Sequence, residues 1–453
     1  MDENLKLAFL TIGIRVLFAP FFAHIWDINT LQVSLHTFTS AGNIYEEIYR
    51  RTLWLQEVTG LKVFYEGYAY LPHVVLIYLP FYVLYLLLGG DPLPIKNVYD
   101  PAHLVKLWFS PDIYVFLLII KLPSIITDAL IALLLSKRSM ICAYLYALSP
   151  YSILITAIWG MFDNMVALLL LLTVMLLEKG EYVKAGVAYS ISLMKFYAIY
   201  AIVPILVFLW RRGGWRAFAL FAPGLIIGQL PTLYFFLTNP EKFLTVLSFH
   251  AERIGGGITP VNALWTVLNL QYQIDASRII GLIGLAVWTA TSICVVKLKT
   301  PTYQAIIATM LAGLFLGKIV NEQYLLCIYP MLLIAESKLA RNLEKWLIAF
   351  AMARSTPVYF AMPLLANSPV FWTILPGWYM LLTQEWYYFI SYVVLFALGT
   401  VFFFRIIIGI FSLIYPGKAM WNPAKELKSS VDRSEAKTGV SRLSRRCKRR
   451  RRC

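Results

Sequence analysis

The sequence predicts an all-α polytopic membrane protein, a bundle of transmembrane helices. Of its 453 residues, 60% are apolar and only 14% are charged, whereas about a quarter are charged in soluble domains. Long apolar runs recur along most of the chain, and about 17–25 apolar residues cross a bilayer as a helix. Several runs reach that length and others are short or interrupted by Pro and Gly. We therefore expect about 11–13 helices, some of them half-spans.

The predicted helices follow the apolar runs in order. The first runs from about Leu7 to Ala23, and we expect it to remain in the protein because it lacks the basic start and small-residue cleavage site of a signal peptide. The later runs are Val74–Leu88, Tyr114–Leu135, Ile141–Ile158, Met165–Leu177, Gly186–Trp210, Phe218–Phe236, Ile279–Val296, Ala305–Leu316, Tyr324–Ala335, Trp346–Ala353 and Tyr387–Ile414.

The positive charge of the chain is concentrated at its C-terminal end. Thirteen Lys/Arg and three Asp/Glu follow residue 415, which accounts for +10 of the total charge of +16. A polybasic segment directly after the last span is typical of a cytoplasmic tail that contacts anionic lipid headgroups. No interleaved aromatic residues accompany it, so we do not expect a nucleic-acid partner. We predict one membrane domain over residues 1–415 and a disordered cytoplasmic tail over residues 416–453.

Basic clusters beside the spans predict part of the topology. The pair Arg211-Arg212 with Arg216, the pair Lys137-Arg138 and the tail should all face the cytoplasm. The side on which Trp159–Asn164 lies then depends on the stretch Lys184–Trp210. A break at Lys195-Phe196-Tyr197 would place Trp159–Asn164 on the outer side together with Asp27, whereas one continuous span would place them on opposite sides. We favour the break.

Three polar loops separate the apolar runs. The first extends from His24 to about Tyr70 and has its own helical stretch near Tyr45–Val58. The second, Gly89–Pro111, is rich in Pro and Asp, and the third, Thr238–Gln273, contains His250, Glu252, Arg253 and the glycine run Gly255–Gly257. We expect specific binding residues in these loops.

Asp27 is the first candidate for chemistry. It follows the first apolar run directly, beside Trp26, which is the amphipathic anchor expected at a bilayer interface. A carboxylate there is partly desolvated and able to act on a group delivered from the lipid. The alternative interpretation is an N-cap for a helix that begins at Asp27, and position alone favours neither.

Further polar groups lie within or beside the apolar runs, where each costs a few kcal/mol to place. Lys195 ends a predicted helix and is well placed to meet a ligand phosphate, and Arg253 can hold a phosphate or sugar-acid oxygen through its planar guanidinium. Lys121 and Asp128 share one helix face, and for Asp128 we favour a structural ion pair with another helix. The other candidates for substrate binding are Asp163, Asn164, His250, Glu322 and Gln323, although Asp163 and Glu322 are also suited to cap helices.

Together these residues supply the parts of a membrane transferase that uses a lipid-phosphate donor. Such an enzyme needs a base that accepts the proton of the acceptor hydroxyl. It also needs cations that offset the charge on the departing phosphate. One-step displacement at the sugar carbon inverts its configuration.

The chain resembles the GT-C superfamily of integral-membrane glycosyltransferases, in particular prokaryotic and archaeal polyprenyl-phosphate-mannose- and -glucose-dependent enzymes. The resemblance covers most of residues 1–340. It is carried by Trp26-Asp27, Gly42-Asn43-Ile44-Tyr45, Tyr68-Ala69-Tyr70-Leu71-Pro72-His73, Lys121-Leu122-Pro123 with Asp128, Ser149-Pro150, Gly160-Met161-Phe162-Asp163, Lys195-Phe196-Tyr197 and Asn321-Glu322-Gln323-Tyr324.

The resemblance implies a large first extracytoplasmic loop, a catalytic base at Asp27, substrate-binding roles for Tyr70 and His73, and a lipid-linked sugar bound from the outer leaflet. The chain departs from the relatives at Ser149-Pro150, where Asn-Pro is usual, and at Met161-Phe162, which precede the second aspartate where Gly-Gln is common. The chain has no tight Asp-X-Asp motif, so we expect no cofactor and do not favour a divalent metal.

We therefore expect an inverting hexosyltransferase in the cell membrane. Its donor would be a polyprenyl-phosphate hexose, mannose or glucose, and its acceptor a glycolipid or lipid-linked glycan at the extracytoplasmic face. A multi-span transporter or lipid flippase is the main alternative, because transporters also build sites from broken helices with buried charges. A membrane scaffold with a recruiting tail is a third. A transferase should gather Asp27, Asp163 and Lys195 around one outward-facing cavity, whereas a transporter should line a path between both faces.

Overall fold

The structure is a computed structural model that describes residues 2–45, 70–99, 105–252, 256–257, 277–317, 319–353, 361, 363–364 and 385–415. Two units divide the chain, Met1–Ile414 and Tyr415–Cys453, and the helices and strands that the structure describes belong to the first. Residues 416–453, for which the sequence predicts a basic tail, lie outside the described residues.

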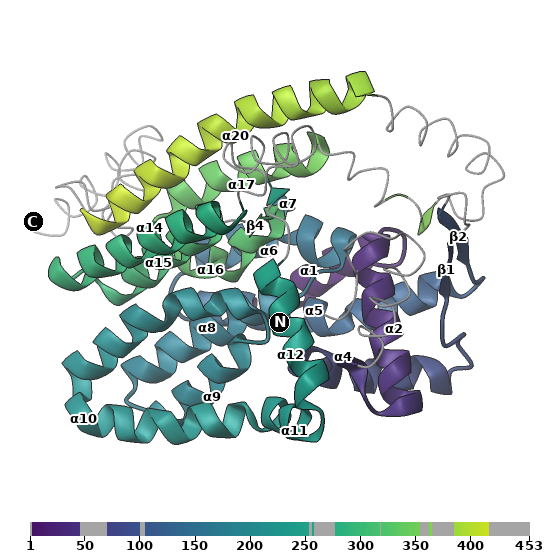
Figure 1. Ribbon diagram of the computed structural model, residues 1–453, viewed down its shortest axis with the longest axis horizontal. Coiled ribbons are helices and arrows are strands. Elements are labelled where there is room, and N and C mark those ends of the chain that lie inside the picture. The colour runs from purple at the N-terminus through teal and green to yellow at the C-terminus, as the bar shows by residue number, and fades with distance from the viewer. Residues whose placement is uncertain are drawn as a thin grey trace, which may run out of the picture. The chain divides into compact units, whose positions relative to one another are not determined.

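The described part of the chain is predominantly helical, as the composition predicts (Figure 1). Its α-helices are α1 (Glu3–Phe18), α2 (Ile25–Ala41), α4 (His73–Leu87), α5 (Ile113–Ser136), α6 (Met140–Ala147), α7 (Pro150–Ile153), α8 (Asp163–Glu178), α9 (Tyr182–Ser192), α10 (Ile202–Gly228), α11 (Leu230–Thr238), α12 (Pro240–Glu252), α14 (Ser277–Lys297), α15 (Thr302–Phe315), α16 (Tyr329–Ala335), α17 (Ser337–Ala353) and α20 (Glu385–Ile414). A π-helix, η1 (Leu154–Trp159), and two 3₁₀ helices, η2 (Phe196–Ala201) and η3 (Glu322–Cys327), connect them.

Four segments are long and apolar enough to cross a membrane: Ile113–Ser136, Phe196–Gly228, Ile279–Lys297 and Phe396–Ile414. A fifth span arises if the bent pair Met140–Ala147 and Pro150–Trp159 crosses as one. These segments agree with the predicted membrane protein. The count of 11–13 helices and the side of the membrane on which each loop lies stay predictions.

The first polar loop contains an amphipathic helix, α2, in a stretch whose polar composition does not indicate a membrane span. After α1 the chain turns and enters α2, in which Ile25, Ile28, Leu31 and Leu35 are all buried. Their spacing of three to four residues forms the apolar stripe of an amphipathic helix. Gly42 ends α2 with φ of 73°, a conformation that glycine adopts without strain. The helical stretch predicted near Tyr45–Val58 lies almost entirely outside the described residues.

The other two loops contain short strands. The second loop includes an antiparallel hairpin of β1 (Ile95–Tyr99) and β2 (Val105–Phe109), with Ile95 opposite Phe109. In the third loop, β3 (Gly256–Gly257) pairs in parallel with β4 (Ile319–Val320). This second pairing brings the glycine run beside the segment that leads into η3.

Gly214 divides α10 into two halves. Its φ of 54° and ψ of −145° are non-helical. A straight helix of this length would separate its ends by about 40 Å. Instead, Lys195 lies a few residues before the start of α10, and the far end at Gly228 packs against Ser190 of α9. The chain therefore turns back at Gly214, and Figure 1 shows the two halves lying along α9 and α8.

Basic turns gather at one end of the helical unit. Arg138, just after α5, forms an ion pair with Glu178 at the end of α8. The kink of α10 reaches the end of α14, because Arg211 Nη2 donates a hydrogen bond to Val296 O at 3.1 Å. The start of α1 joins the same end through a 2.8 Å bond from Ser136 Oγ to Asn4 Oδ1. The basic residues close to these contacts are Lys137, Arg138, Lys179, Lys184, Arg211, Arg212, Arg216, Lys297 and Lys299.

Candidate functional site

Asp27 lies in the first turn of α2. A helix therefore does begin here, as the interpretation of Asp27 as an N-cap requires. The carboxylate, however, does not cap it. Trp159 Nε1 donates a hydrogen bond to Asp27 Oδ2 at 2.6 Å, and His24 Nδ1 lies 2.7 Å from the same oxygen. The His24 contact has the distance of an ion pair without the alignment of a good hydrogen bond. The Asp27 side chain is 30% exposed.

A second cluster forms around Asp163 at the start of α8. Lys195 Nζ donates a hydrogen bond to Asp163 Oδ2 at 2.7 Å, and Tyr197 OH donates one to Asp163 Oδ1. The ammonium also lies 4.3 Å from the ring centroid of Phe162 and 5.5 Å from that of Tyr70. Aromatic faces at these distances attract a cation. Asp163 and Lys195 are both buried.

The two clusters share one end of the helical unit, opposite the basic turns. Trp159, which binds Asp27, and Phe162, which contacts Lys195, are separated by only two residues. The break predicted at Lys195 is present, because α9 ends at Ser192 and η2 begins at Phe196. Trp159–Asn164 therefore lies at the same end of the helical unit as Asp27, and the side of the membrane on which that end lies stays a prediction.

The groups around Asp27 lower its pKa by more than burial raises it. Desolvation by burial alone raises the pKa of this carboxyl group. The charge and close contact of His24, the indole N–H of Trp159 and the charge of Lys195 together lower the pKa below its ordinary value. Asp27 is therefore a carboxylate at neutral pH, which is the form able to accept a proton.

The π-helix η1 contributes side chains to two carboxylates. Thr156 Oγ1 donates to Asp128 Oδ2 at 2.6 Å, and Trp159 donates to Asp27. Single π-turns are frequent at functional sites because they re-aim the side chains of a helix. Gly160 ends the turn with φ of 91°, and a Cβ there would lie 2.8 Å from Ile28 Cδ1. Only glycine fits this junction without strain.

Lys121 supports the same junction from α5. Its ammonium donates hydrogen bonds to Ala19 O at 3.1 Å, to Ala157 O at 2.8 Å and to Phe22 O. These are carbonyls at the end of α1, in the turn after it and in η1, where free carbonyl groups need donors. Lys121 thus joins the chain before Asp27 to the chain before Gly160.

The seven-residue spacing of Lys121 and Asp128 does not produce a direct pair. Asp128 instead binds Arg15 Nε from the last turn of α1, Tyr146 OH at 2.5 Å and Asn164 Nδ2 at 2.9 Å. This confirms the expectation of a structural ion pair with another helix. Arg15 was hidden because it lies inside the run from Leu7 to Ala23 that reads as apolar.

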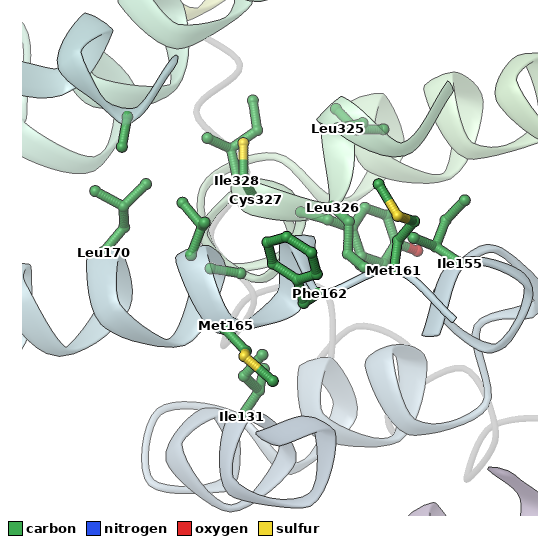
Figure 2. Packing of buried hydrophobic residues seen from close by; sticks show 14 of the residues in the cluster. Ile131, Ile155, Met161, Phe162, Met165, Leu170, Leu325, Leu326, Cys327 and Ile328 are labelled. Atoms are coloured by element: carbon green, nitrogen blue, oxygen red, sulfur yellow. The ribbon is translucent and has the colours of Figure 1, made fainter. Parts of the chain in front are cut away.

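The segment from Asn321 to Tyr324 approaches the start of α8. Tyr324 packs against Tyr197 with ring centroids 5.0 Å apart, and Tyr151 OH donates to Glu322 O at 2.6 Å. Glu322 and Gln323 are buried, and within the described residues the Oε1 atom of Gln323 has no hydrogen-bond partner. Figure 2 shows Leu326 and Cys327 of η3 beside Phe162 and Met161, so this segment packs against the residues that directly precede α8.

The remaining predicted site residues are placed differently. His73 is buried in α4, with Nε2 2.7 Å from Gly228 O at the end of α10. This contact joins α4 to the end of α10. The His73 ring is buried between them. His250 belongs to α12, but its side chain lies outside what the structure describes, as does the whole of Arg253. Their binding roles stay predictions.

Among the described residues no group of His, Cys, Asp and Glu has the arrangement of a metal site. Comparison with protein-family models and with characterised proteins finds no match to this chain. The resemblance to membrane glycosyltransferases therefore rests on the motifs quoted above.

Two residues of the Asp27 cluster were not predicted as site residues. His24 precedes Asp27 by three residues, which is the spacing of neighbours on one helical turn, and this spacing was available in the sequence. Trp159 lies 132 residues away from Asp27, and no local pattern joins them.

Proposed function

We propose that this chain is an inverting membrane glycosyltransferase. It would move a hexose, mannose or glucose, from a polyprenyl-phosphate donor to a glycolipid or lipid-linked glycan. One observation carries the proposal: Asp27, Asp163 and Lys195 come from three separate segments of the chain, yet they lie at one end of the helical unit. An accessible carboxylate there stands beside a cation lined by aromatic rings.

The proposed reaction uses Asp27 as the general base. The hydroxyl proton of the acceptor passes to the Asp27 carboxylate while the hydroxyl oxygen bonds to the anomeric carbon of the donor. The bond from that carbon to the phosphate oxygen breaks, and its electron pair leaves with the phosphate. Attack from the face opposite the leaving group inverts the configuration.

Lys195 is the proposed partner of the leaving phosphate. An ammonium has three N–H donors, and within the described residues Asp163 Oδ2 is the oxygen that receives one of them. The remaining donors suit a phosphate oxygen. The Asp163–Lys195 pair also keeps the cation in place before the donor binds.

The two ends of the helical unit support an extracytoplasmic site. Lysine and arginine at the turns gather at the end that includes Arg138 and Arg211, and such clusters favour the cytoplasm. The Asp27 cluster lies at the other end. The large first extracytoplasmic loop implied by the resemblance would then contain α2 and the segment leading to Tyr70.

The test is transfer of a labelled hexose from polyprenyl phosphate by the purified protein in lipid nanodiscs. Asp27→Asn removes the base while keeping the shape of the side chain, so transfer should fall by about 10²- to 10⁴-fold with an unchanged unfolding temperature. Glu241→Gln, at an exposed acid in the first turn of α12, is the control and should retain wild-type transfer.

Equal transfer by Asp27→Asn and wild type would remove Asp27 as the base. The alternative of a transporter or flippase is tested with the same purified protein reconstituted in sealed lipid vesicles. Movement of the labelled lipid between leaflets without any sugar transfer would contradict the proposed enzyme and favour transport.

A further inference from the structure

His24 and Trp159 both contact the same oxygen of Asp27. The indole N–H of Trp159 and Nδ1 of His24 lie 2.6 Å and 2.7 Å from Oδ2. Within the described residues no hydrogen bond reaches Oδ1. An ionised carboxylate has acceptor positions on both oxygens, so one side of this group is occupied and the other is open.

The two side chains that contact Oδ2 are themselves held in place. Their rings stack with centroids 5.0 Å apart and an interplanar angle of 27°. The backbone N–H of His24 donates to Trp159 O at 2.9 Å, and Ile28 N–H donates to His24 O at 3.1 Å. Helix α2 and the end of η1 are therefore joined at the residues that bind the carboxylate.

We infer that His24 and Trp159 are positioning residues that fix Oδ2 of Asp27, so that Oδ1 is the atom that accepts the proton from the acceptor hydroxyl. The inference rests on the proposed function and names the reacting atom of that site. An indole can only donate, so Trp159 cannot take the proton itself.

His24 contributes position to this arrangement, and in its protonated form it contributes charge as well. Imidazole presents an N–H donor at Nδ1 when that nitrogen faces a carboxylate, and the ring is a cation when both nitrogens are protonated. Among the residues that the structure describes, the other charged groups on this side of the site are Lys195 with its partner Asp163, and Lys121 behind Gly160. All three come from other segments of the chain and stay in place when His24 is replaced.

The first experiment measures Asp27 without any sugar substrate. A carbodiimide reacts with a protonated carboxyl group, so the pH dependence of Asp27 labelling, followed by peptide mass spectrometry, gives the protonation midpoint. His24→Ala removes a contact that favours the carboxylate, and the midpoint should move to higher pH. His36→Ala, on the same helix but without a described contact to Asp27, is the matched control and should leave the midpoint unchanged.

The second experiment measures transfer. His24→Ala and Trp159→Phe should lower kcat by about 10- to 100-fold, the size expected when a reacting group is misplaced, with little change in KM for the donor. His24→Asn should recover part of the loss, because its amide nitrogen can stand where Nδ1 stands. The low-pH limb of the activity should move to higher pH in His24→Ala and remain in place in His36→Ala.

Unmoved labelling in a folded His24→Ala protein would overturn the inference, and so would a kcat equal to wild type in both His24→Ala and Trp159→Phe. If His24→Ala does not fold, Trp159→Phe carries the same test. A shifted midpoint in a protein with no transfer at all would contradict the proposed function while leaving the contacts to Oδ2 supported, so the two failures are distinguishable.

Discussion

Two buried carboxylate clusters border the π-helix η1, and they differ in how completely their oxygens are occupied. Asp128 is fully buried and receives hydrogen bonds from Arg15, Tyr146, Thr156 and Asn164 on both of its oxygens. Asp27 is 30% exposed, and its described contacts, the hydrogen bond from Trp159 and the ion-pair contact of His24, both reach one oxygen. A saturated carboxylate has nothing left to offer a ligand, whereas one with an open oxygen can react.

The difference teaches how polar groups in an apolar bundle divide their roles. A buried charge must be paired and hydrogen-bonded, or it costs several kcal/mol. Asp128 meets this requirement within the protein and joins α1, α5, α6, η1 and α8. Asp27 meets it in part: its described contacts reach Oδ2, and its side chain is 30% exposed.

Breaking the Asp128 cluster should give the largest effect. Arg15→Met leaves Asp128 as an unpaired buried charge, and loss of one partner of such a pair costs about 3–5 kcal/mol. We expect a large fall in the thermal unfolding temperature of the purified protein. The double variant Arg15→Met with Asp128→Leu removes both charges and should recover much of the stability.

Arg216→Met replaces an exposed arginine and is the control for this pair. An Arg15→Met protein as stable as Arg216→Met would contradict the structural role of the Asp128 cluster. Transfer activity that followed stability in every variant would support that role further.

The Asp163–Lys195 pair is intermediate between Asp128 and Asp27: it is buried, and we propose that its lysine also binds substrate. Variants of Lys195 test this case. Lys195→Met should raise KM for the donor by about 10- to 100-fold, since a charge-assisted hydrogen bond contributes about 1.5–3 kcal/mol. It also strands Asp163, so the double variant Lys195→Met with Asp163→Asn is needed. That variant should fold but still bind the donor weakly.

Recovery of both folding and donor binding in the double variant would show that the Asp163–Lys195 pair is structural, like Asp128. Lys184→Met is the matched control, because Lys184 is exposed and pairs with Glu181 at the surface. Donor KM should be unchanged there.

Replacement of Gly160 should have the smallest effect on stability. It tests the packing at the junction between the Asp128 and Asp27 clusters. Gly160→Ala places a Cβ within 2.8 Å of Ile28 and 2.9 Å of the Lys121 side chain at φ of 91°, and should cost about 1–3 kcal/mol. Gly180→Ala has a similar φ of 75° but meets no atom within 4 Å, so it measures backbone strain alone. Calorimetric unfolding of the two variants gives the difference, and equal losses would contradict the close packing at Gly160.

The sequence predicted several residues of the candidate site, but it did not predict which side chains contact one another there. Asp27, Asp163 and Lys195 were predicted from their positions beside apolar runs, and the break at Lys195 followed from charge asymmetry. His73 is predicted as a binding residue from its motif; its Nε2 lies 2.7 Å from Gly228 O, and its binding role stays a prediction. Arg15 was overlooked because one arginine barely alters the hydropathy of a long run, although its charge is balanced by Asp128 on another helix.

The sequence by itself determined the class of the protein, because apolar content and run length are properties of the chain alone and they force helices in a membrane. It also determined which turns are basic. The tertiary structure decided which carboxylate is saturated and which is open, since the partners of Asp128 and Asp27 come from segments up to 132 residues away. Contacts of that range depend on how helices pack, and no local pattern of residues records them.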